Sequence, residues 1–181
     1  MIKKKRFLFI LIPSLILPSF VIIKYGVSLT AMAILPYSVV SFAIFRKKLV
    51  SKEILERAIG IAALSTILYL MIFAISERNF RIVSGMFSHG LLALVLAAGL
   101  FLITRGGFSI FDLKTVSLQA IAFSVFPLKV FLIPLVGAFL VATLFSAYLL
   151  ARRKATTSMT VAFTPIVVFT SWISLFYFIS L

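Results

Sequence analysis

Long uninterrupted runs of apolar residues alternate along this chain with short segments that carry nearly all of its charge. A helix that crosses a bilayer needs about 20 apolar residues, and only helices or closed barrels satisfy the backbone in lipid. Barrel strands would be short and would alternate polar with apolar positions. The unbroken runs therefore predict membrane-spanning helices at 7–23, 27–45, 58–75, 82–104, 115–126, 130–150 and 161–181.

One of these runs is ambiguous. The run 115–126 is short for a crossing and stops at Pro127. It is therefore either a half-helix or a crossing that is completed by residues on either side. The charged segments 46–57 and 105–114 are predicted to be loops between runs.

The basic residues test how many runs cross the membrane. If all seven cross and the N-terminus is cytoplasmic, all but four of the 18 Lys and Arg residues lie on the cytoplasmic side. The exceptions are Lys24, Arg78, Arg81 and Lys129. Because cytoplasmic loops carry an excess of Lys and Arg, the count favours an all-α bundle of about seven transmembrane helices with the C-terminus outside. Treating 115–126 as a segment that does not cross weakens this bias.

Composition narrows the class further. The chain is 63% hydrophobic, and no soluble domain of its size is so apolar, so 1–181 is predicted to be one multi-pass domain of the cell membrane. It has no cysteine, which excludes disulfides and thiol catalysis. The net charge of +14 comes from basic residues dispersed in short loops, which indicates lipid headgroups rather than nucleic acid as the partner. His89 is the only histidine and has no acid nearby, so we expect no metal and no cofactor.

Asp112 is the only aspartate and the strongest candidate for chemistry. It lies between two apolar runs, just after Gly106 and Gly107 and two residues before Lys114. A carboxylate at the mouth of a hydrophobic bundle is costly to desolvate, so such a residue is by default a candidate functional site. Its predicted position is the cytoplasmic side, at the start of the fifth run.

The surroundings of Asp112 resemble those of the type IV prepilin peptidases and archaeal preflagellin peptidases, which are intramembrane aspartic endopeptidases. In that family the second catalytic aspartate lies in a Gly-x-Gly-Asp-x-Lys stretch after a glycine-rich loop. Here residues 109–114 read Ser-Ile-Phe-Asp-Leu-Lys. The Asp-Leu-Lys end matches, whereas Ser109 and Phe111 replace the two glycines.

Two further segments carry the resemblance, which covers roughly residues 27–175. Residues 152–154 (Arg-Arg-Lys) and 162–165 (Ala-Phe-Thr-Pro) are similar to the family's basic loop and the Pro-Phe-x-Pro segment that opens its last helix. Residues 46–51 (Arg-Lys-Lys-Leu-Val-Ser) are similar to the basic loop that reads Asp-Leu-Arg-x-Arg-Arg-Ile-Pro-Asn in the family. This register puts Ala43 where the first catalytic aspartate belongs. The resemblance as a whole implies six helices like those of the family, preceded by one additional helix at the N-terminus.

The missing aspartate decides what the resemblance implies for activity. In an aspartic peptidase one carboxylate takes a proton from the attacking water while the other, protonated, polarises the scissile carbonyl. Asp112 alone cannot do both, so the expectation is a weak or inactive endopeptidase on pilin-like leaders. Such a protein could still bind the hydrophobic leader helix of a pilin-like or other single-span substrate.

Two glutamates are possible substitutes for the missing acid. Glu53 and Glu56 lie on the same predicted side as Asp112, three residues apart, and can share one helical face. We favour the simpler interpretation, in which they form a solvated cluster with Lys52 and Arg57. Two other functions stay open: a small transport subunit that binds a vitamin-like solute, and a structural subunit of a membrane assembly.

Overall fold

A computed structural model of the chain describes residues 19, 22–23, 28–45, 51–103, 108–152 and 163–180, and every regular element in these ranges is a helix. The described helices are α3 (Leu29–Phe45), α4 (Lys52–Ser76), α5 (Phe80–Ile103), α6 (Ile110–Ala122), the short 3₁₀ helix η1 (Phe123–Val125), α7 (Leu128–Ala151) and α8 (Phe163–Ser180). The predicted all-α class is confirmed. Most of the first apolar run lies outside the described residues.

Among the described residues, three helices are long and apolar enough to cross a membrane: α4, α5 and α7. The 25 residues of α4 extend about 37 Å at 1.5 Å per residue, which exceeds the hydrocarbon thickness of a typical bilayer. α3 and α8 are shorter apolar helices. The protein is therefore a helical membrane protein, while the number of crossings and the side on which each end lies stay predictions.

The prediction of loops at 46–57 and 105–114 is wrong at the end of each segment. α4 already begins at Lys52 and α6 at Ile110, so their charged residues lie on helices. Both helices are preceded by a serine N-cap: the Ser51 and Ser109 side chains accept hydrogen bonds from backbone N–H groups three residues later. An acidic residue in the first turn of each helix suits the positive end of the helix dipole. The charges thus mark helix starts.

α6 is too short to cross a bilayer alone. Its 13 residues extend about 20 Å, and the chain then tightens into η1. Phe126 is extended (φ −102°, ψ 165°) because Pro127 disfavours the helical conformation in the residue before it. α6 itself ends at Ala122, and the helical stretch that includes η1 ends at Val125, one residue before the predicted end at Phe126. α6 begins five residues earlier than the predicted Thr115.

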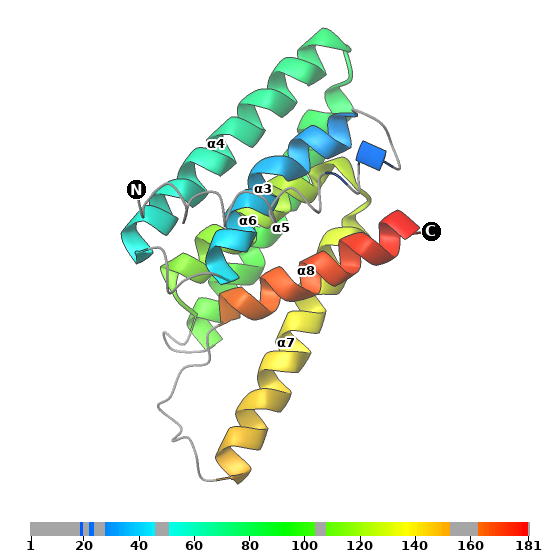
Figure 1. Ribbon diagram of the computed structural model, residues 1–181. Coiled ribbons are helices and arrows are strands. Elements are labelled where there is room, and N and C mark those ends of the chain that lie inside the picture. Colours follow the sequence, from blue (N-terminus) through cyan, green and yellow to red (C-terminus); the bar gives the residue numbers. More distant parts are fainter. Residues whose placement is uncertain are drawn as a thin grey trace.

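α6 lies at the centre of the described helices. It contacts α3, α4, α5 and α8, and α3 also contacts α4 and α8 (Figure 1). α8 crosses this group, and α7 packs mainly against α8 and extends away from the other helices. Since α6 touches four neighbours, polar residues on its buried face can meet partners from several parts of the chain.

A proline inside α7 explains how α7 and α8 hold together. Pro134 has no N–H, so the carbonyl of Val130 loses its helical partner. The Ser174 hydroxyl of α8 donates to this Val130 oxygen at 3.4 Å, and the Thr170 hydroxyl donates to the Pro134 oxygen at 2.8 Å. Neighbouring hydroxyls commonly satisfy backbone groups freed by proline in membrane helices.

Candidate functional site: a buried aspartate between α6 and α8

Asp112 closes the N-terminus of α6 through a capping box. Its Oδ2 accepts a hydrogen bond from the Ser109 backbone N–H at 2.9 Å and another from the Ser109 hydroxyl at 2.6 Å. The Asp112 N–H in turn donates to Ser109 Oγ at 3.2 Å. This reciprocal arrangement satisfies backbone donors that a helix start leaves free. Ser109 is therefore the local partner of the aspartate.

The other carboxylate oxygen reaches across the bundle to the start of α8. Oδ1 accepts a hydrogen bond from the Thr164 backbone N–H at 2.9 Å and a second from the Thr164 hydroxyl. Asp112 is only 7% exposed and Thr164 only 3%. A contact between residues 52 positions apart thus joins two helix N-termini through one buried carboxylate, and each N-terminus favours negative charge.

Four donors occupy the Asp112 carboxylate. An ionised carboxylate offers about four acceptor positions, so little capacity remains for a water molecule or a substrate proton. No second carboxylate is hydrogen-bonded to Asp112; the other three acids of the chain are Glu53, Glu56 and Glu77, all at the two ends of α4. Ala43 is partly buried against the core on α3. The described residues therefore contain no paired acid for aspartic peptidase chemistry.

The two candidate substitute acids are engaged in ion pairs. Glu53 accepts a bond of 2.6 Å from Arg57, one turn along α4. Glu56 lies 3.2 Å from the Nζ of Lys114 and 3.8 Å from that of Lys52. These side chains are substantially exposed, as the solvated-cluster interpretation predicts.

The Lys114 side chain therefore points to α4 and not to the carboxylate of Asp112, two residues earlier in the sequence. Two residues along a helix correspond to a rotation of roughly 200°, so Asp112 and Lys114 leave α6 on different sides. Asp112 faces α8, and Lys114 faces Glu56 of α4. The Asp-Leu-Lys stretch therefore joins α6 to two different helices.

An apolar pocket of about 400 Å³ opens between α5 and the start of α6. Its lining residues are Leu94, Ala97, Ala98, Phe108, Ser109, Ile110 and Leu113. Ser109, which caps Asp112, forms part of its wall, so the pocket and the carboxylate are neighbours. The described residues present no polar surface to this pocket, which suits an apolar side chain or chain segment.

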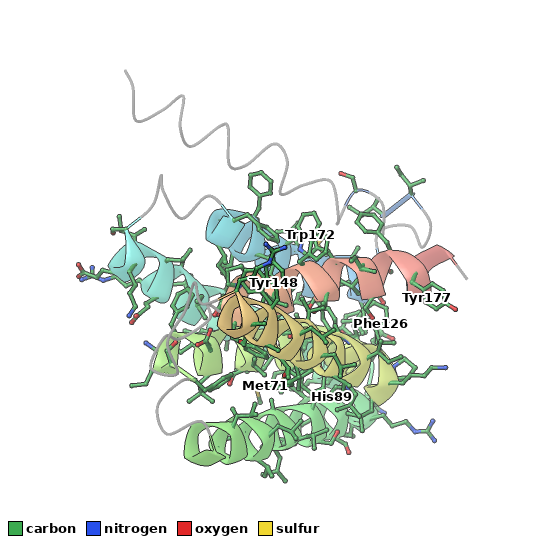
Figure 2. All side chains as sticks on the ribbon, turned by 90° about the horizontal axis from the view of Figure 1, so that it is seen from below. Met71, His89, Phe126, Tyr148, Trp172 and Tyr177 are labelled. Atoms are coloured by element: carbon green, nitrogen blue, oxygen red, sulfur yellow. The ribbon has the colours of Figure 1, made fainter. Side chains whose placement is uncertain are left out.

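His89 is engaged in contacts within the helix bundle. Its Nδ1 lies 2.8 Å from the carbonyl of Gly85, one turn earlier in α5, and its ring packs 5.9 Å from that of Phe131 of α7. Figure 2 shows the labelled His89 on α5, beneath α7 in that view. Among the described residues no cluster of three or more potential metal ligands occurs.

Comparisons with known proteins add no relative: no family model matches the chain, and neither the curated proteins nor the solved structures gave a match. Gly106, Gly107 and the basic segment 46–50 lie outside the described residues. The interpretation of the site consequently depends on the geometry around Asp112.

Sequence reasoning missed the partners of the carboxylate. Thr164 was noted only as part of the Ala-Phe-Thr-Pro segment, and nothing in its spacing indicates a contact 52 residues away. A second buried polar group, Gln119, was also missed, although it is the only glutamine of the chain. A lone amide inside an apolar run is a signal that could have found it, because buried polar groups in membranes are costly.

Proposed function

We propose that this protein is a prepilin-peptidase-like membrane protein in which the surviving aspartate holds helices together and does not cleave peptides. It binds the hydrophobic helix of a single-span, pilin-like substrate and leaves that substrate intact. The observation that carries the proposal is the saturation of the Asp112 carboxylate by the donors of Ser109 and Thr164.

The resemblance gains support from one long-range contact. In the family resemblance, the Asp-x-Lys stretch and the segment that opens the last helix were matched separately, on sequence order alone. Asp112 and Thr164 belong to these two segments and are hydrogen-bonded to each other. The contact supports the resemblance because it joins two segments that were matched independently.

The loss of cleavage follows from the chemistry available. Peptide hydrolysis by carboxylates needs one group to accept a proton and another to donate one. Asp112 would have to release several hydrogen bonds before acting as either, and the glutamates that could assist are paired with Arg57 and Lys114. The apolar pocket beside Ser109 is, in contrast, suited to receive part of a hydrophobic helix.

The test combines cleavage with cross-linking in membranes. The substrate is a single-span reporter with a short basic leader before its hydrophobic helix, and a photoreactive residue replaces Ala98 in the pocket. We expect cross-linking to the reporter and no shortened product. The matched control places the photoreactive residue at Leu144, on the exposed face of α7, where we expect little cross-linking.

Two outcomes would contradict the proposal in different ways. A shortened product that disappears in Asp112→Ala and also in Glu53→Ala or Glu56→Ala would reveal a working acid pair. Equal cross-linking from positions 98 and 144 would contradict the proposal that the pocket binds the hydrophobic helix of the substrate.

A further inference from the structure

Polar side chains of α3, α6 and α8 are buried in the bundle, about two turns of α6 beyond Asp112. Gln119 of α6 and Ser171 of α8 are completely buried, and Tyr37 of α3 is 1% exposed. The Tyr37 ring packs edge-on against Phe123 at 5.4 Å, and Phe123 lies one turn beyond Gln119 on the same side of the chain. We call Tyr37, Gln119 and Ser171 the buried polar cluster.

Hydrogen bonding in this cluster is incomplete. The Tyr37 hydroxyl and both side-chain atoms of the Gln119 amide have no partner among the described residues. The Ser171 hydroxyl lies close enough to that of Tyr37 for a weak interaction, although the two do not form a hydrogen bond of good geometry. Ser171 Oγ donates to the Val167 carbonyl at 2.6 Å and keeps a lone pair free.

Neighbouring polar groups at the same junction are satisfied. The Trp172 indole N–H of α8 donates to Ser41 Oγ of α3 at 2.9 Å, and the Ser41 hydroxyl donates to the Ser38 carbonyl. Figure 2 shows the labelled Trp172 between α8 and α3. Among the described residues, buried side-chain atoms without a partner belong to Tyr37, Gln119 and His89, and His89 lies on α5, outside this cluster. Unpaired polar atoms are costly in a core that lipid surrounds, so this junction needs a further partner.

We propose that the buried polar cluster binds water, in the form of one or two molecules that join the Tyr37 hydroxyl, the Gln119 amide and the Ser171 hydroxyl. The groups offer two donors, the Tyr37 O–H and the Gln119 N–H, and two acceptors, Gln119 Oε1 and Ser171 Oγ. A buried water typically makes about three hydrogen bonds, within the range of two to four that this set can supply. Such water holds α3 against α6 and α8.

A cation fits the same cluster poorly. A monovalent cation buried in a membrane core needs a negative partner. The nearest carboxylate on α6 is that of Asp112, about 10 Å away along the helix axis, and four donors already occupy it. The Gln119 amide N–H would also face the ion. Water, which can both donate and accept, matches the mixed set of groups.

Radiolytic hydroxyl-radical labelling of the purified protein in detergent gives a direct test, because radicals formed from bound water oxidise adjacent side chains even when these are buried. We expect labelling of Tyr37 and loss of that label in Gln119→Leu. Leu135, buried on α7 among apolar neighbours, is the reference that stays unlabelled. An unlabelled Tyr37 would overturn the proposal.

Thermal unfolding of Tyr37→Phe gives an independent readout. If water bridges the cluster, loss of the hydroxyl removes one of its hydrogen bonds, and we expect the unfolding midpoint to fall by about 3 °C. If the cluster is dry, the same change removes an unpaired polar atom and the midpoint rises. Tyr69→Phe, at a half-buried position on α4, is the matched control and should leave the midpoint unchanged. A raised midpoint in Tyr37→Phe would exclude bound water.

Discussion

The buried polar side chains at the two ends of α6 differ in how completely they are hydrogen-bonded. At the N-terminal end, Asp112 accepts hydrogen bonds from both the backbone and the hydroxyl of Ser109 and of Thr164. Near the C-terminal end, Gln119 is completely buried and its amide has no partner among the described residues. Burial alone therefore does not identify the residue that is free to bind something; the pairing of its atoms does.

Charge explains this difference. Removing an ionised carboxylate from water costs far more than removing a neutral amide, so only a fully bonded carboxylate is compatible with a stable bundle. A neutral amide can rely on one or two water molecules. The residue that the sequence marks as chemically most prominent is accordingly the one whose hydrogen-bonding capacity is most completely used.

We expect the largest loss of stability when Asp112 is replaced. Asp112→Ala leaves the N–H and hydroxyl groups of Ser109 and Thr164 without their acceptor, and we expect the free energy of unfolding to fall by about 3 kcal/mol. Thermal or denaturant unfolding in a mild detergent measures the change. Asp112→Asn, which keeps the shape and one acceptor oxygen, should lose less. An unchanged stability in Asp112→Ala would indicate that the carboxylate is kept for chemistry instead.

Close packing at the other end of α6 predicts the next largest effect. A Cβ added to Gly85 of α5 would lie 2.9 Å from the carbonyl oxygen of Ser124 in η1, which is backbone and cannot easily move. We expect Gly85→Ala to cost about 1 to 3 kcal/mol. Gly90 of the same helix has no atom within 4 Å of the added Cβ. Gly90→Ala should therefore be neutral or stabilising, and equal losses in both variants would contradict the close approach of α5 to η1.

Removing the Thr164 hydroxyl tests how much one donor to Asp112 contributes to stability. Thr164→Val keeps the shape and the backbone N–H but deletes one of the four donors to Asp112, so we expect a loss of about 1 kcal/mol. The measurement is again detergent unfolding. Thr143→Val, at an exposed position of α7, is the control and should change little. If Thr164→Val lost as much stability as Asp112→Ala, the Thr164 hydroxyl alone would account for the stabilisation that the contacts of Asp112 provide.

The ion pair beside Asp112 should contribute least. Lys114 and Glu56 are partly exposed and lie 3.2 Å apart, and such pairs contribute little in water. We expect Lys114→Met to cost less than about 0.5 kcal/mol, and the difference from the unaltered protein should shrink further in high salt. A cost comparable to that of Asp112→Ala would make the α4–α6 pair, and not the α6–α8 contact, the main support of α6.

Particular residues show how far the sequence could be read. The apolar runs predicted the helices well because burial in lipid demands long apolar segments, and Pro127 correctly marked the end of the short one. The starts of α4 and α6 were misjudged because charged residues were taken as loop, although Ser51 and Ser109 are favourable N-caps. Glu53 and Glu56 were correctly interpreted as members of an exposed charged cluster.

The sequence by itself determined the class of this protein: the unbroken apolar runs can be satisfied only as membrane helices, and a single aspartate offers no acid pair. What only the tertiary structure decided is which polar atoms are satisfied. Hydrogen bonds depend on distances of about 3 Å between groups that are far apart in the chain, and hydropathy carries no information about them. The donors of Thr164 on α8 satisfy the carboxylate of Asp112, whereas no described group satisfies the amide of Gln119.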